Sequence, residues 1–136
     1  MMQSQELSDL MQASAQDAKI YAAEQHQISL EGDLASLSQV DQLLSQLHTA
    51  QQTKAHSSEM LFTLCNIMGA YVGEIFIHNV GGHWQSNNID QTAPYMAVGF
   101  GDKEFPFASV CYHKITNDNS ISLQAYVQQA KQNAMQ

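Results

Sequence analysis

Three side chains with metal-binding chemistry follow one another closely in the chain. Glu74 and His78 are four residues apart, so on a helix they project from one face, and His83 follows them. One carboxylate and two imidazoles could supply three zinc ligands, with water as the fourth, as in a small metal-dependent hydrolase. The spacing differs from the His-Glu-x-x-His pattern of metalloproteases, and a hydrogen-bonded acid–imidazole pair is the simpler interpretation. We therefore expect no metal or cofactor and keep the hydrolase as an alternative.

The cysteines are weak candidates for nucleophilic catalysis. Cys111 and His113 are two residues apart and point to different sides of a helix, and Cys65 falls among apolar residues. A catalytic thiol needs a positive environment, and the chain has five lysines and no arginine. We expect both cysteines to be free and buried, with a disulfide between them as the alternative.

A pair of carboxylates is a third possible catalytic arrangement. Glu74 with Asp102 or Glu104 would have the residue types that glycoside hydrolysis requires. Nothing in the sequence brings these carboxylates together, because an acidic chain contains many such pairs.

The composition restricts the class of partner. The chain has 136 residues, enough for one domain with its own core, and 13 acidic residues give a net charge of -8. Such a charge repels nucleic acids and anionic lipids and attracts a basic protein. No signal peptide and no run of about 18 apolar residues is present, so we predict a cytoplasmic location and no membrane partner.

The hydrophobic patterns predict a helix-dominated α+β domain with about five helices and a two- or three-stranded antiparallel sheet. The predicted helices are 4–26, 36–51, 58–80, 106–117 and a last helix that Ser120 or Ser122 caps. The predicted strands are 83–86, 95–100 and a short third one at 103–105. A strand is the alternative for residues 108–115, and residues 28–30 form either a connector or a minor strand. Helix 58–80 is apolar on most of its faces, so we expect it to be the buried central helix.

The first helix carries a modest apolar stripe. Its members are spaced by three and four residues: Leu7, Leu10, Met11, Ser14, Ala18, Tyr21 and Ala22. We expect the stripe to pack within the domain, and a contact with a second copy in a homodimer is the alternative, so the sequence allows a monomer or a homodimer.

Glycines punctuate the central helix and its end. Gly69 and Gly73 are four residues apart in a helix interior, where each is unfavourable by about 1 kcal/mol against alanine unless a neighbour approaches closely. Gly81 is placed to end the helix. The pattern Gly-Ala-Tyr-Val-Gly-Glu, then Gly-Gly-His-Trp, resembles a family of small, uncharacterised bacterial domains. The motif residues are Gly69, Tyr71, Gly73, Glu74, Gly81, Gly82 and Trp84.

The resemblance covers roughly residues 30 to 130 and extends to Phe105-Pro106-Phe107 and to the segment from Leu34 to Leu44. It implies a glycine-rich helix, a short antiparallel sheet and a further helix opened by Pro106, and it implies no reaction. Related domains occur in bacterial gene neighbourhoods linked to competition and defence.

Together these observations favour a non-catalytic cytoplasmic binding protein, of the immunity or antitoxin type, that inhibits a toxin or effector. An acidic surface would speed its encounter with a basic partner, and aromatic anchors would slow release. The metal-dependent hydrolase and a dimeric chaperone or adaptor are the alternatives. The candidate partner-binding residues are Trp84, Asp90, Asp102, Glu104 and Asp118.

Overall fold

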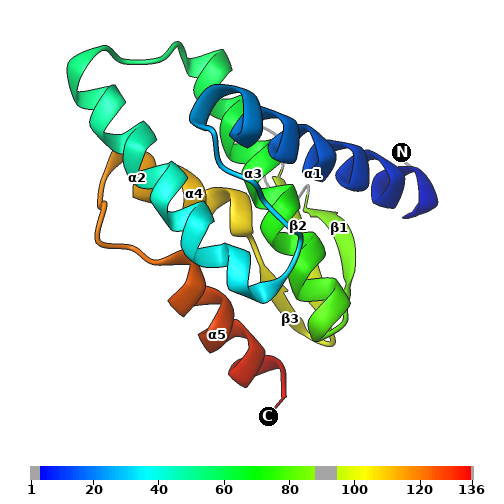
Figure 1. Ribbon diagram of the computed structural model, residues 1–136. Helices are drawn as coiled ribbons and strands as arrows, with labels where there is room; N and C mark the ends of the chain where they lie inside the picture. Colours follow the sequence, from blue (N-terminus) through cyan, green and yellow to red (C-terminus); the bar gives the residue numbers. More distant parts are fainter. Residues whose placement is uncertain (1–3, 88–94, 136) are drawn as a thin grey trace.

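The computed structural model describes residues 4–87 and 95–135, and it confirms the α+β class. Over these residues it has five α-helices and a three-stranded antiparallel sheet, arranged as Figure 1 shows. In chain order the elements are α1 (Ser4–His26), a short 3-10 turn (Leu34–Ser36), α2 (Leu37–Thr53), α3 (Ser58–Asn79), β1 (His83–Asn87), β2 (Tyr95–Phe100), β3 (Lys103–Phe105), α4 (Phe107–Thr116) and α5 (Leu123–Ala134). Residues 28–30 form a connector rather than a minor strand, and Ile28 and Leu30 within it are buried.

Helix α3 is the central helix, as the sequence predicts. It begins where the Ser57 hydroxyl accepts a hydrogen bond from the amide of Met60, and half of its residues are buried. It contacts α1, α4 and β2. By length and composition α3 could also cross a membrane, but 61% of the qualifying window is buried inside the protein, which is typical of a core helix.

Gly69 and Gly73 bring two neighbours close to α3. A Cβ atom at Gly69 would lie 2.6 Å from the backbone of Ala108 in α4, and one at Gly73 would lie 2.1 Å from the ring of Trp84. The helix therefore packs closely against the backbone of α4 at Gly69 and against the indole ring of Trp84 at Gly73. Beyond its end, Gly81 adopts a positive φ of 127°, as the sequence predicts for the residue that stops it.

Helix α1 packs across α3 through a stripe that differs from the predicted one. The buried members are Leu7, Met11, Ala15, Ala18 and Ala22. Leu10 is 44% exposed and Ser14 only half-buried, so both lie beside the contact with α3 rather than in it. The three alanines lack bulk, so the interface is narrow and leaves the Leu10 side of α1 open.

The sheet has the order β1-β2-β3, with Trp84 opposite Val98 and Val98 opposite Phe105. These three side chains share the face that belongs to the hydrophobic core, since side chains alternate along a strand. Gln85 and Ala97 are paired and lie on the other face.

Residues 107–116 are helical, which rejects the strand alternative. Phe107 packs against Phe76, with 5.6 Å between ring centroids, and edge-on against Tyr126 of α5. The α2 carboxylate of Asp41 accepts hydrogen bonds from the amide of Leu123 at 2.6 Å and from the next amide, so it caps α5.

Candidate functional site

The three potential metal ligands do not converge. The Glu74 carboxylate accepts a hydrogen bond from the indole N–H of Trp84 at 2.8 Å. The Nδ1 of His78 instead donates a hydrogen bond to the backbone carbonyl oxygen of Glu74, 2.7 Å away. His83 is exposed on β1. Within residues 4–87 and 95–135 no three histidine, cysteine or acidic side chains are arranged to hold a metal ion. Glu74, His78 and His83 therefore do not form the three-ligand group that the sequence suggests.

The cysteines are free, and burial keeps them protonated. Desolvation raises the pKa of the Cys65 thiol to about 12, and it also raises the pKa of the fully buried Cys111 well above its ordinary value. A thiolate is the nucleophilic form, so neither side chain has the character of a catalytic cysteine.

The carboxylates of Glu74 and Glu104 belong to opposite faces of the sheet. Glu74 bonds Trp84, whereas Glu104 accepts a hydrogen bond from Gln85 at 3.0 Å, and adjacent residues of a strand project to opposite faces. Glu104 also accepts from the hydroxyl of Tyr95, which lowers the pKa of this carboxyl. The two carboxylates therefore do not form a hydrolytic pair.

The remaining predicted partner-binding residues do not gather in one place. Trp84 is buried against Gly73 and presents little surface. Asp102 is exposed at the turn between β2 and β3, and Asp118 lies in the connection between α4 and α5. In Figure 1 this connection and the β2–β3 turn lie on opposite sides of the molecule. Asp118 accepts hydrogen bonds from the amide and hydroxyl of Ser120, which lower its pKa. Asp90 lies outside the described residues.

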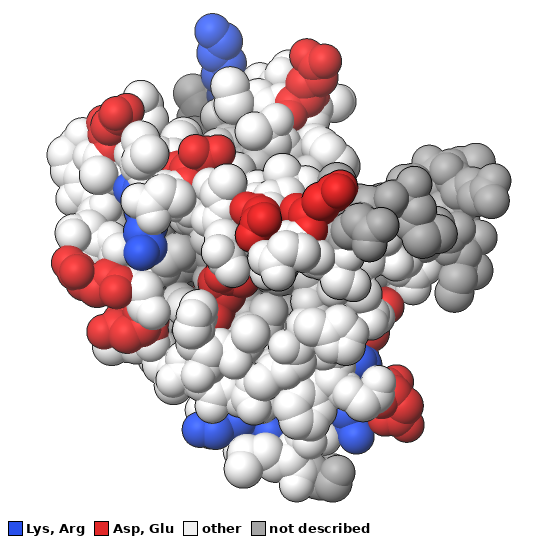
Figure 2. Space-filling model, turned by 90° about the vertical axis from the view of Figure 1, so that its right-hand side faces the viewer, with Lys and Arg blue, Asp and Glu red and all other residues white. Residues whose placement is uncertain are grey.

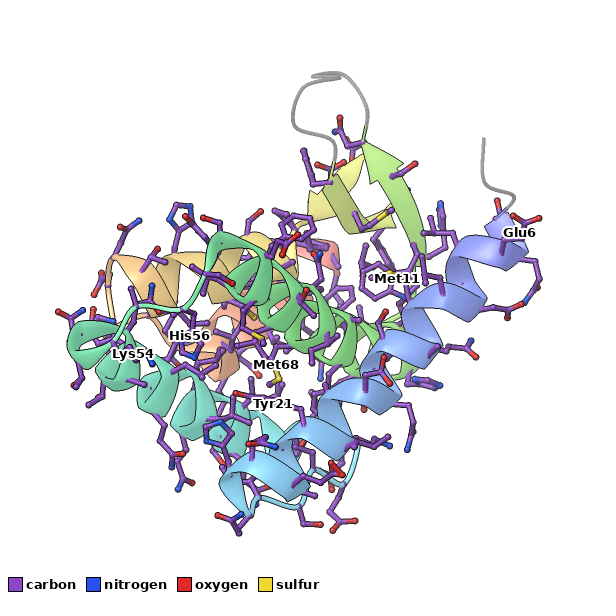
Figure 3. All side chains as sticks on the ribbon, turned by 90° about the horizontal axis from the view of Figure 1, so that it is seen from above. Glu6, Met11, Tyr21, Lys54, His56 and Met68 are labelled. Carbon is purple, nitrogen blue, oxygen red and sulfur yellow. The ribbon has the colours of Figure 1, made fainter. Side chains whose placement is uncertain are left out.

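An apolar groove lies where α1, α3, α4 and the strands β1 and β2 diverge. Its volume is about 690 Å³, and its apolar lining includes Leu10 and Met11 of α1, Phe62 of α3, Tyr95 and Met96 of β2, and Tyr112 of α4. Met11 can be found in Figure 3 beneath the sheet, on the side of α1 that faces α3. We call this feature the apolar groove.

Four large side chains on the rim of the apolar groove remain open to solvent. Phe62 is 66% exposed, Tyr112 45%, Leu10 44% and Tyr95 38%. Isolated exposed apolar residues are ordinary, whereas these four come from four elements and share one groove, which makes the groove the candidate binding surface. The polar members of the lining include no acidic residue and no lysine: they are Ser14, Asn66, Ser86, Ser109 and His113.

Acidic side chains border the apolar groove. Glu6 precedes Leu10 by four residues on α1, and Glu59 precedes Phe62 by three on α3, so each extends a face that lines the groove, and both are exposed. Glu104 is hydrogen-bonded to Tyr95 on the rim. No lysine is part of the lining among the described residues, and Figure 3 shows Lys54 at the far end of α2. The charged side chains that these relationships place beside the groove are therefore acidic.

A second, smaller cleft lies on the other side of the α1–α3 contact. Its volume is about 310 Å³, and its lining is mostly polar, with Lys19, Glu74 and His78 among the contributors. The Tyr71 hydroxyl at its edge is engaged with the amide of Gly32 and the hydroxyl of Ser36. The predicted motif residues Tyr71 and Glu74 are thus occupied with internal contacts beside this cleft.

The apolar groove is not predictable from the sequence patterns. Periodicity places Leu10 in the stripe of the first helix, and the central helix, to which Phe62 belongs, is apolar on most sides and therefore predicted to be buried. One signal was available: the central helix is apolar on more sides than its neighbours can cover. Tyr112 also lies off the stripe formed by Phe107, Cys111 and Ile115.

Comparison of the chain with protein-family models, with curated proteins and with solved structures gives no match. The resemblance to uncharacterised bacterial domains therefore stays a prediction. The case for a function depends on the geometry of the molecule alone.

Proposed function

We propose that this chain is a non-catalytic binding protein of the cytoplasm, and that it inhibits a basic toxin or effector in the manner of an immunity protein or antitoxin. The observation that carries the proposal is the apolar groove, whose rim side chains from α1, α3, α4 and β2 stay exposed. Burial of such aromatic and aliphatic anchors supplies most of the binding energy at protein interfaces. The anchors differ from the predicted Trp84, which lies in the core.

The charge of the molecule supports a basic partner. A net charge of -8 attracts a basic protein over a distance, and Glu6, Glu59 and Glu104 place negative charge beside the groove. Charges at the rim of an interface act mainly on the association rate and on specificity. The acidic surface would therefore guide the partner, and the groove would hold it.

The state of the reactive groups supports a role without catalysis. The Glu74 carboxylate accepts a hydrogen bond from the Trp84 indole, and burial keeps the thiols of Cys65 and Cys111 protonated. The apolar groove is lined mainly by apolar side chains, which suits the binding of a partner better than acid–base catalysis.

A dimeric chaperone or adaptor is the second candidate. The specific observation in its favour is that α1 contributes to both the core and the groove, so a second copy could dock beside Leu10. Sedimentation of the purified protein at neutral pH distinguishes the two. A stable dimer that Phe62→Ser converts to a monomer would favour the adaptor, and a monomer favours the inhibitor.

The decisive experiment captures partners from a lysate of the source cells, including products of neighbouring genes, on the tagged protein and on two variants. Phe62→Ser removes a groove anchor, and Ile20→Ser removes a comparably exposed apolar side chain that does not line the groove. We expect one basic protein, retained by the parent and by Ile20→Ser, lost by Phe62→Ser, and weakened as salt rises from about 0.05 to 0.5 M. Equal capture by both variants, or no stoichiometric partner, would sink the proposal.

A further inference from the structure

The apolar groove offers side chains rather than backbone groups to an occupant. The lining from the sheet consists of Ser86, Tyr95 and Met96, where β2 pairs with β1, and the rest of the lining comes from the helices α1, α3 and α4. An extended peptide laid against these helices would bury N–H and C=O groups away from water without partners, because a helix uses its own backbone groups internally, and this burial is unfavourable. An α-helix satisfies its backbone internally and needs only apolar side chains at its contact face.

Charge decides between a second copy and a different protein as occupant. Two copies each carry a net charge of -8, and the groove is bordered by Glu6, Glu59 and Glu104, so a second copy would bring like charges together. Lysine or arginine beside the apolar stripe of a partner would face these carboxylates instead. The complementary occupant is therefore basic.

We propose that the apolar groove binds one basic amphipathic α-helix of the partner protein, with its apolar residues between Phe62 and Leu10 and its cationic residues against the flanking acids. This inference rests on the proposed function and specifies the part of the partner that is recognised. The cavity of about 690 Å³ is within the range of sites that enclose a group of apolar side chains.

Two synthetic peptides of identical composition test the conformation of the occupant. Each has about 15 residues, chiefly leucine and lysine, a length at which an isolated helix is marginal and can be ordered on binding. One peptide places leucine at three- and four-residue spacings, and the other alternates leucine and lysine, which favours a strand. Their affinities for the full chain are measured by calorimetry, and circular dichroism follows helix formation. Because the two peptides carry equal charge, a difference in affinity reports on the pattern of leucine and lysine alone.

We expect the helical pattern to bind at least about ten-fold more tightly than the alternating one and to gain helix on binding. Phe62→Ser should weaken this binding by about ten-fold or more, Ile20→Ser should leave it unchanged, and Glu59→Lys should slow association. Equal binding of the two patterns, or an affinity that Phe62→Ser does not alter, would overturn the helix inference.

The outcome is separable from that of the proposed function. If neither peptide binds while Phe62→Ser still abolishes capture of the natural partner, the groove binds protein but not a helix of this kind, and only this inference fails. If the purified chain is a dimer that Phe62→Ser dissociates, the occupant is a second copy, which also overturns it. If Phe62→Ser leaves capture of the partner intact, both proposals fail together.

Discussion

The hydroxyl of Tyr71 joins the central helix to the connector between α1 and α2. It accepts a hydrogen bond from the amide of Gly32 at 2.8 Å and lies 2.7 Å from the hydroxyl of Ser36. Because Ser36 donates its proton to the carbonyl of Asp33, Tyr71 is the donor to Ser36. Tyr71 is buried, and desolvation raises its pKa. This motif residue therefore has a structural role.

Tyr71→Phe should lower the free energy of unfolding by about 1–3 kcal/mol, since it leaves the Gly32 amide without its acceptor. Tyr126→Phe is the matched control, because Tyr126 is half-buried and its hydroxyl has no hydrogen-bond partner among the described residues. Urea unfolding of the parent and both variants measures the difference. Equal stability of the two variants would show that the Tyr71 hydroxyl contributes nothing.

The contact between α3 and α4 depends on the absence of a side chain at Gly69. A Cβ atom there would lie 2.6 Å from the Ala108 backbone, which can yield only if the two helices separate. Alanine gains about 1 kcal/mol in helix propensity, and overpacking against a backbone costs about 1–3 kcal/mol or more. We expect Gly69→Ala to be less stable than the parent by about 1–2 kcal/mol in urea unfolding.

Gly73→Ala provides a control with a different neighbour. Its new methyl group would displace the ring of Trp84, the only tryptophan, and disturb the hydrogen bond to Glu74. The native fluorescence should therefore change in Gly73→Ala and stay as in the parent in Gly69→Ala. A Gly69→Ala variant at least as stable as the parent would contradict the close packing of α3 on α4.

The elements were largely predictable, because their signals are local. Helix 4–26 and strands 95–100 and 103–105 have the predicted bounds, and Ser122, one of the two predicted cap residues, caps the last helix. The open sides of the helices were not predictable in the same way. Whether Leu10 or Phe62 is covered depends on how α1 and α4 cross α3, and periodicity gives the face of a helix but not its neighbours. The apolar groove therefore emerges only from the tertiary arrangement.

Two properties of the whole molecule oppose each other. The apolar groove would favour association between copies, and the net charge of -8 would oppose it. Figure 2 shows acidic side chains spread over one face among uncharged ones rather than gathered in a single patch. On this face the negative charge is thus distributed, and we expect the repulsion between copies to come from the net charge of -8 rather than from one acidic patch.

When the repulsion between copies is removed, the apolar groove should allow them to associate. The sequence pI is about 4.9, so the net charge of -8 at pH 7 falls toward zero as the pH approaches this value. We expect the parent and Ile20→Ser to be monomers at pH 7 and to associate reversibly near pH 5, whereas Phe62→Ser stays monomeric at the same concentration. Sedimentation velocity measures the association, and circular dichroism confirms that the fold is retained at both pH values. Association of Phe62→Ser equal to that of the parent would mean that charge alone, and not the apolar groove, governs contact between copies.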